Sequence, residues 1–119
     1  MEKKHILIVD DEPQIGKIFG LKLKLAGYDV STITSGAEAI NLISKQNFDI
    51  LLLDILMPDV TGLDVLEKVR EFSQIPIIVF TARPDVFEIA KSMGANDYIS
   101  KPLNPEHLVQ KIKKVLNDD

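Results

Sequence analysis

Polar side chains follow four short apolar runs of the sequence, at the point where each run ends. Asp10 and Asp11 follow the first run, Asp54 the second, Thr81 the third and Lys101 the last. Three carboxylates close together repel one another and need a cation, and oxygen ligands at an open site favour Mg²⁺. A carboxylate beside Mg²⁺ can attack phosphorus, while an ammonium and a hydroxyl can stabilise the charge of a phosphoryl group. The pattern therefore indicates a site that accepts a phosphoryl group on an aspartate.

Five segments are expected to form the strands that position these groups. Continuous apolar runs are typical of parallel strands buried on both faces, whereas a half-polar run is typical of an edge strand. The continuous runs are His5–Val9, Ile50–Leu53 and Ile75–Phe80, the weaker run is Asp97–Ser100, and the half-polar run is Tyr28–Ile33. Segments with helical spacing separate them, so the chain repeats a strand–helix unit five times.

The boundaries of several helices are marked by capping residues. Asn104 precedes a proline and the apolar stripe of the last helix, which is the pattern of a helix start. Two residue pairs have the spacing of a capping box: Ser35 with Glu38, and Thr61 with Asp64. The segment Leu21–Leu25 alternates like a strand, but Leu and Lys favour helices and no β-branched residue is present. We therefore expect a helix there.

Alternating strands and helices predict a parallel sheet with helices on both faces. In the flavodoxin-like strand order 2-1-3-4-5, the first and third strands lie side by side at the centre. Asp10, Asp11 and Asp54 then converge at the carboxyl edge of the sheet, with Thr81 and Lys101 beside them. The predicted fold class is α/β, a doubly wound (βα)5 fold with a five-stranded parallel sheet.

Length and composition exclude several other classes of protein. The chain has 119 residues, which predicts a single domain over residues 1–119. Because its net charge is −4, we do not expect direct binding to nucleic acid or to a membrane surface. The absence of cysteine excludes disulfides, thiolate zinc sites and cysteine nucleophiles. No apolar run approaches the roughly 20 residues of a membrane span, and no signal peptide is recognisable, so a cytoplasmic location is expected.

Four motifs occur in order along the whole chain and carry a family resemblance. They are Ile8-Val9-Asp10-Asp11-Glu12, Asp54-Ile55-Leu56-Met57-Pro58-Asp59-Val60-Thr61-Gly62, Phe80-Thr81-Ala82, and Gly94-Ala95-Asn96-Asp97-Tyr98-Ile99-Ser100-Lys101-Pro102. With these motifs the sequence resembles the receiver domain of the two-component response regulator family. The resemblance implies a signalling switch that catalyses its own Mg²⁺-dependent phosphorylation and dephosphorylation, and not an enzyme that turns over an external substrate.

The resemblance also implies roles for three aspartates of these motifs and for Lys101. Asp54 is expected to be the phosphoacceptor. Asp11 and Asp54 are expected to bind Mg²⁺ directly, together with the backbone carbonyl of Leu56, and Asp10 mostly through water. Lys101 is expected to pair with Asp54 and then with the phosphoryl oxygens.

Further roles concern the switch that follows phosphorylation. The Thr81 hydroxyl and the Ala82 backbone N–H are expected to donate hydrogen bonds to the phosphoryl group. Tyr98 is expected to be the switch aromatic, which turns inward as Thr81 moves. The Lys101–Pro102 peptide bond is expected to be cis. An apolar Leu56 and an Arg83 over the site are predicted to slow the loss of the phosphoryl group.

The expected partners also follow from the resemblance. A sensor histidine kinase or a histidine phosphotransfer protein would supply the phosphoryl group from a phosphohistidine. Its docking surface is predicted to be a small apolar patch on the first helix, centred on Ile15 or Ile18 and rimmed by Lys17. The fourth helix, fifth strand and last helix would contact an output domain or form a homodimer, although the last helix lacks the Arg of one such dimer pattern.

Two other functions compete with this interpretation. A receiver-like interaction module that takes no phosphate usually lacks one of the key residues, and none is missing here. A hydrolase of the haloacid dehalogenase type needs two aspartates separated by one residue after the first strand, whereas Asp10 and Asp11 are adjacent.

Overall fold

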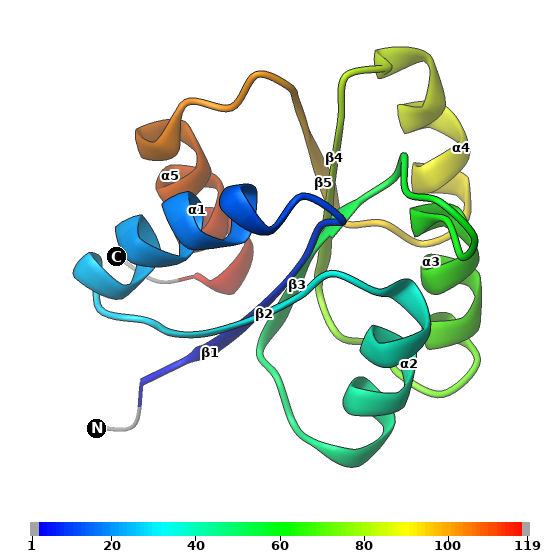
Figure 1. Ribbon diagram of the computed structural model, residues 1–119, viewed down its shortest axis with the longest axis horizontal. Helices are drawn as coiled ribbons and strands as arrows, with labels where there is room; N and C mark the ends of the chain where they lie inside the picture. The colour runs from blue at the N-terminus through cyan, green and yellow to red at the C-terminus, as the bar shows by residue number, and fades with distance from the viewer. Residues whose placement is uncertain (1–2, 118–119) are drawn as a thin grey trace.

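The computed structural model describes residues 3–117, in which strands and helices alternate along the chain (Figure 1). The strands are β1 (His5–Val9), β2 (Asp29–Ile33), β3 (Ile50–Asp54), β4 (Ile77–Thr81) and β5 (Asp97–Ser100). The helices are α1 (Pro13–Leu25), α2 (Gly36–Lys45), α3 (Gly62–Arg70), α4 (Phe87–Ser92) and α5 (Pro105–Leu116), and a short 3-10 turn, η1 (Pro84–Val86), precedes α4.

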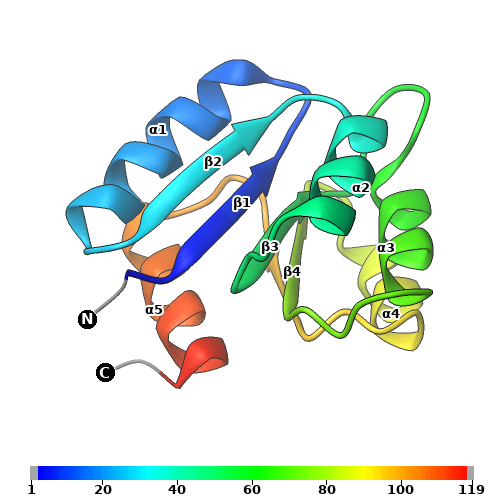
Figure 2. The same ribbon diagram turned by 90° about the horizontal axis from the view of Figure 1, so that it is seen from below.

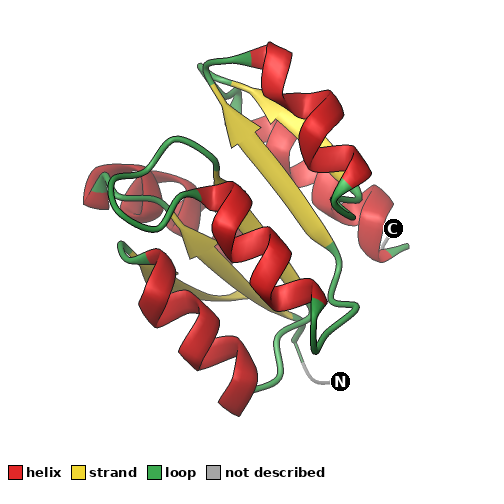
Figure 3. Cartoon of the chain, turned by 90° about the vertical axis from the view of Figure 1, so that its right-hand side faces the viewer, coloured by secondary structure: helices red, strands yellow, loops and turns green. Residues whose placement is uncertain are grey.

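The strands form one five-stranded sheet in the order β2-β1-β3-β4-β5, and every neighbouring pair is parallel (Figure 2). Helices α1 and α5 cover one face, while α2, α3 and α4 cover the other (Figures 1 and 3). The predicted flavodoxin-like topology is confirmed. All carboxyl ends of the strands therefore meet at one edge of the sheet.

The core consists of two apolar layers, one on each face of the sheet. Successive strand residues alternate between the layers, so Leu51 and Leu53 pack beneath α2 and α3, whereas Ile50 and Leu52 pack beneath α1 and α5. Each of these four side chains has at most 1% of its surface exposed. Burial on both faces explains why the strands are continuous apolar runs rather than alternating ones.

The predicted bounds of β2, β3 and β4 need correction. β3 extends through Asp54, and β4 runs through Thr81 and begins at Ile77 instead of Ile75. The ladder continues past Leu53 because the N–H of Ile55 donates to the carbonyl of Phe80 at 3.2 Å. Asp54 and Thr81 are thus the last residues of their strands, which fixes their backbones within the sheet. At the other edge, β2 begins at Asp29, one residue after the predicted start.

The alternating segment at the end of α1 is helical, as predicted. The helix buries Gly16, Phe19, Gly20 and Leu23, a face with helical spacing. Leu21 and Leu25 point to solvent, with 61% and 78% of their surfaces exposed. Of the predicted caps, Thr61 and Asp64 form a full capping box, and Asn104 caps α5. Ser35 caps α2 by accepting from the N–H of Glu38, which is one of the two hydrogen bonds of the predicted box. Within residues 3–117, no helix combines the length and apolarity that crossing a bilayer requires.

Candidate functional site

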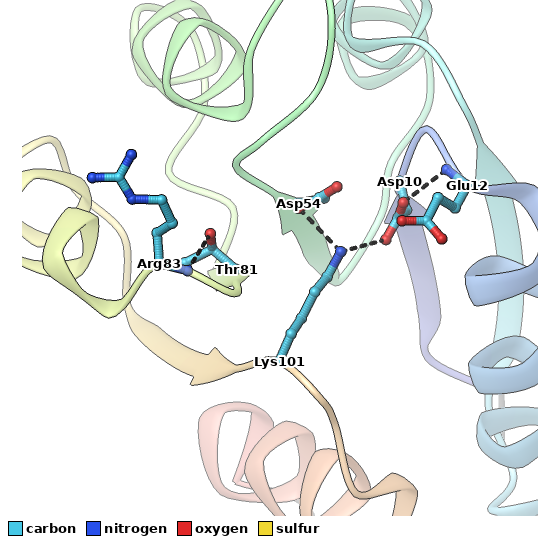
Figure 4. Close-up of polar contacts among 6 residues, drawn as sticks. All are labelled: Asp10, Glu12, Asp54, Thr81, Arg83 and Lys101. Carbon is cyan, nitrogen blue, oxygen red and sulfur yellow. Dashed lines mark hydrogen bonds and ion pairs between the residues drawn. The ribbon is translucent and has the colours of Figure 1, made fainter.

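The predicted site residues gather at the carboxyl edge of the sheet (Figure 4). Asp10 follows β1, Asp54 ends β3, Thr81 ends β4, and Lys101 follows β5. The central pairing of β1 with β3 brings the acidic residues together although they are far apart in sequence. Thr81 and Lys101 are neighbours across β4 and β5, where the N–H of Lys101 donates to the carbonyl of Thr81 at 2.9 Å.

Asp10, Asp11 and Asp54 form a compact acidic cluster. One carboxylate oxygen from each lies within 4.8 Å of the others. Asp10 and Asp54 are each only 2% exposed, whereas Asp11 is partly exposed. Oδ1 of Asp54 is buried and has no hydrogen-bond partner among the described residues. A buried, unsatisfied carboxylate oxygen between two other carboxylates fits a hard divalent cation with oxygen ligands.

Lys101 provides the cation of this cluster in the structure. Its Nζ lies 3.3 Å from Oδ2 of Asp10 and 3.4 Å from Oδ1 of Asp54 (Figure 4). The same Nζ lies 5.1 Å from the ring centroid of Phe80. The Lys101–Pro102 bond is cis, as predicted. One ammonium thus bridges two buried carboxylates and leaves a net negative charge in the cluster.

The protonation equilibria of the cluster reflect its burial. Desolvation, together with the charge of Asp10, raises the pKa of Asp54 to about 7. Desolvation also raises the pKa of Asp10, although a hydrogen bond from the N–H of Glu12 at 2.8 Å opposes this effect. Burial lowers the pKa of Lys101, but the charges of Asp54 and Asp10 outweigh it and hold this pKa above its ordinary value. Lys101 is therefore charged at neutral pH, while Asp54 is near its titration point.

Thr81 is fully buried, and its hydroxyl faces the loop that follows β4. Oγ1 accepts a hydrogen bond from the N–H of Arg83 at 3.1 Å, which leaves the hydroxyl proton available for another acceptor. Arg83 was predicted to lie over the site, but its side chain does not. Its guanidinium points away from Asp54 and binds Asp85 through contacts of 2.7 and 3.2 Å (Figure 4). Two oppositely charged side chains two residues apart account for this orientation.

Gly62 fixes the backbone beneath the acidic cluster. Its N–H donates to the carbonyl of Ile55 at 2.9 Å. A Cβ atom at this position would lie 2.2 Å from the carbonyl oxygen of Asp54 and 2.5 Å from Cα of Ile55. Only glycine allows α3 to begin this close to the end of β3. Leu56, in the same loop, has 48% of its surface exposed.

A groove with a volume of about 510 Å³ begins beside the acidic cluster. One wall is α1, with Ile15 and Ile18, and the opposite wall carries Leu103 and Pro105. Glu12, Ala82 and Lys101 line it as well, so it adjoins the site. Ile15 and Ile18 were predicted from the sequence as a docking patch, whereas the second wall was not. The position of Leu103 and Pro105 directly after Lys101-Pro102 was the available signal.

Tyr98 lies apart from the acidic cluster, on the outer part of the sheet between α4 and α5. Its ring stacks on Phe87, with 4.1 Å between ring centroids and an interplanar angle of 29°. About 46% of its surface is exposed. The stacking partner was not predicted, because an aromatic residue at the start of a helix does not reveal which strand residue it will contact.

Comparison with known proteins assigns this arrangement to a family. The family model for the response regulator receiver domain matches residues 6–113. The chain belongs to this family. The receiver domain is 43% identical over 115 residues to response regulator SaeR of Staphylococcus aureus, a match that covers 94% of this chain and 50% of SaeR. It is 41% identical to the probable transcriptional regulator ycf27 of Cyanidium caldarium, covering 94% of this chain and 46% of that protein.

Solved structures agree with this assignment. The receiver domain superposes on chemotaxis protein CheY4 of Vibrio cholerae with a TM-score of 0.90 and 34% identity, covering 97% of this chain and 100% of CheY4. It superposes on response regulator TrrA of Thermotoga maritima, solved in complex with Mg²⁺-BeF, with a TM-score of 0.87 and 36% identity, covering 95% and 99%. The chain spans about half the length of the curated relatives it matches.

Proposed function

We propose that Asp54 accepts a phosphoryl group from a phosphohistidine donor and thereby switches the output face of the domain. The observation that carries this proposal is the buried Oδ1 of Asp54, which lacks a hydrogen-bond partner within the described residues and lies 3.4 Å from the ammonium of Lys101. A carboxylate held in this way is poised to gain a partner, and a phosphoryl group with its counter-cations supplies one.

The chemistry assigned to the chain's own residues is simple. An oxygen of ionised Asp54 attacks phosphorus, the P–N bond to the donor imidazole breaks as the P–O bond forms, and an acyl phosphate results. The ammonium of Lys101 then shifts towards the phosphoryl oxygens. The hydroxyl of Thr81 and the N–H of Ala82 donate hydrogen bonds to these oxygens. Attack by water later releases inorganic phosphate and restores the carboxylate.

A divalent cation, Mg²⁺, is the proposed cofactor. The carboxylates of Asp10, Asp11 and Asp54 and the backbone carbonyl of Leu56 would hold it. When bound, the ion supplies positive charge that offsets the repulsion between the carboxylates and the phosphoryl oxygens. The clustering of carboxylate oxygens within 4.8 Å supports this assignment.

The groove beside the site is proposed to bind the phosphoryl donor. A donor histidine must approach Asp54 closely, so the surface next to the site must touch the donor protein. The groove shares Ala82 and Lys101 with the site and presents Ile15 and Ile18 for apolar contact. An amphipathic helix of a sensor histidine kinase or histidine phosphotransfer protein fits such a groove.

The remaining assignments concern the output. Tyr98 and Thr81 are the proposed switch residues, and the face formed by α4, β5 and α5 is proposed to contact an output domain or a second copy of the chain. We propose a cytoplasmic location and no direct nucleic-acid contact by this domain. We also propose that the domain modifies itself and turns over no external substrate.

One experiment tests the proposed function. Intact mass is measured after incubation with Mg²⁺ and acetyl phosphate, for the parent protein and for Asp54→Asn. A gain of one phosphoryl group in the parent alone is the expected result. No gain in a folded parent would instead favour a receiver-like interaction module. Release of phosphate from a generic phosphatase substrate would favour a hydrolase.

A further inference from the structure

The ring of Tyr98 shares one face of the sheet with Thr81. Tyr98 lies opposite Val79 in the β4–β5 register, and Thr81 is two residues further along β4. Side chains two residues apart point to the same face of a strand, so Val79, Thr81 and Tyr98 all point to the face covered by α4. A turn of the Tyr98 ring towards Thr81 is therefore a movement within one side of the sheet.

Phe87 occupies the place from which it can oppose that movement. It is the first residue of α4 and follows η1, which continues directly from the loop after Thr81. Only 8% of its surface is exposed, and it belongs to the apolar layer that contains Val79 and Ala90. Its ring thus packs into the core and also against the ring of Tyr98, at 4.1 Å between centroids.

A cation from α5 contacts the same tyrosine. Nζ of Lys111 lies 5.3 Å from the ring centroid of Tyr98 and donates to its carbonyl oxygen at 3.0 Å. Asp97 holds this ammonium in place with a contact of 2.8 Å. Contacts from both α4 and α5 therefore stabilise the half-exposed position of the Tyr98 ring.

We infer that Phe87 is a positioning residue that sets how readily Asp54 is phosphorylated, because its stack with Tyr98 stabilises the unphosphorylated conformation. This inference rests on the proposed function, with Tyr98 as the switch aromatic. A contact made in only one of two conformations shifts the equilibrium towards that conformation. Since the stack is lost when Tyr98 turns towards Thr81, Phe87 lowers the population of the conformation that holds a phosphoryl group best.

The test compares the parent with Phe87→Leu, which keeps an apolar side chain in the core but removes the ring. We expect the rate of phosphorylation by acetyl phosphate and Mg²⁺ to rise about two- to tenfold, the factor that the loss of one aromatic pair gives. The affinity for beryllofluoride with Mg²⁺ should rise by a similar factor, because the same conformational equilibrium limits both. A merely structural role would lower the stability to urea without raising the rate or the affinity.

Matched variants make the test specific. Phe48→Leu removes the ring of another aromatic pair, in which Phe48 lies 4.5 Å from the ring of His5 at an interplanar angle of 52°, far from the acidic cluster, and should leave the phosphorylation rate unchanged. In a Tyr98→Ala background, Phe87→Leu should no longer raise the rate, because the two residues act through one contact. If Phe87→Leu proves unfolded in the urea measurement, Phe87→Ile takes its place.

The outcomes separate this inference from the proposed function. If the parent gains no phosphoryl group, the proposed function fails and the role of Phe87 fails with it. If the parent is phosphorylated but folded Phe87→Leu matches its rate and beryllofluoride affinity, only the inference is overturned. An equal rise in the Tyr98→Ala background also overturns it, because the effect would then bypass Tyr98.

Discussion

The ammonium of Lys101 lies 3.4 Å from Oδ1 of Asp54, close enough for an ion pair, yet that oxygen has no hydrogen-bond partner among residues 3–117. Lys101 shares its charge with Asp10, from which it lies 3.3 Å. The arrangement leaves the ammonium free to shift towards a group added to Asp54.

Replacing Lys101 by methionine should slow phosphorylation of Asp54 by acetyl phosphate about 10²-fold, the usual effect of removing one group that stabilises developing charge. The time course of intact mass measures this. Lys68→Met is a suitable control, because Lys68 lies on α3 and forms an exposed ion pair with Glu71, the residue that follows this helix. Equal rates for Lys101→Met and the parent would show that Lys101 does not stabilise the transferring group.

Asp54→Asn should stabilise the protein at pH 8 without Mg²⁺, by at least about 1 kcal/mol. The pKa of Asp54 rises from 3.8 to about 7 on folding, through burial first and the charge of Asp10 second. At a pH between these two pKa values, the carboxyl of Asp54 holds a proton in the folded state and has released it in the unfolded state. The free energy of unfolding of the parent should therefore fall as the pH rises from about 4 to about 7, then level off.

Urea unfolding across this pH range tests the prediction. Asp54→Asn should show a smaller decrease, and adding Mg²⁺ at pH 8 should stabilise the parent more than the variant. If the stability of the parent changed between pH 4 and pH 7 by the same amount as that of Asp54→Asn, the raised pKa of Asp54 would be contradicted.

Gly62→Ala should lower both stability and phosphorylation. The new Cβ would lie 2.2 Å from the carbonyl oxygen of Asp54, so the end of β3 and the start of α3 must separate. We expect a loss of about 1–3 kcal/mol in the free energy of unfolding. The matched control is Gly20→Ala in α1, where the nearest atom of Val30 lies 3.5 Å from the new Cβ. That change should be neutral or stabilising by up to about 1 kcal/mol, since alanine favours helices.

Leu56→Asn should shorten the lifetime of the phosphorylated protein. Leu56 is half-exposed in the loop after the phosphoacceptor, and an amide there can orient an attacking water whereas an isobutyl group cannot. Arg83→Glu should have a weaker effect, because the guanidinium is engaged by Asp85 at 2.7 Å and points away from Asp54. Dephosphorylation half-lives measured after removal of the donor decide this, and unchanged half-lives for both variants would refute a role of either side chain.

Ile18→Ala and Leu103→Ala should slow phosphotransfer from a cognate phosphohistidine protein about tenfold but leave the reaction with acetyl phosphate unchanged. Both residues line the groove beside the site, from opposite walls. Ile89→Ala, a half-exposed isoleucine on α4, is the control outside the groove. Acetyl phosphate is small enough to react without binding in the groove. Comparing the two donors therefore distinguishes a defect in docking from a defect in the chemical step. Slower transfer from both donors would locate the defect in the site itself.

Local patterns predicted the strands and the main site residues, and the strand order common to flavodoxin-like sheets predicted which strands lie side by side. The apolar runs mark strands buried on both faces, and the polar residues that follow them must lie at one edge of a parallel sheet. Asp10, Asp54, Thr81 and Lys101 are brought together in this way. The boundaries were less accurate, since hydrogen bonds of the ladder carry β3 and β4 through Asp54 and Thr81.

The partners of several side chains became clear only from the folded structure. Arg83 was expected over the site but binds Asp85, and Tyr98 stacks on Phe87. The second wall of the groove, with Leu103, was likewise not foreseen. The pattern of apolar runs predicts which groups reach the carboxyl edge, because the spacing of residues along a strand is a local property. Packing and ion pairing decide which way each side chain turns there, because a rotamer depends on all the atoms that surround it in the fold, and sequence spacing alone does not give these.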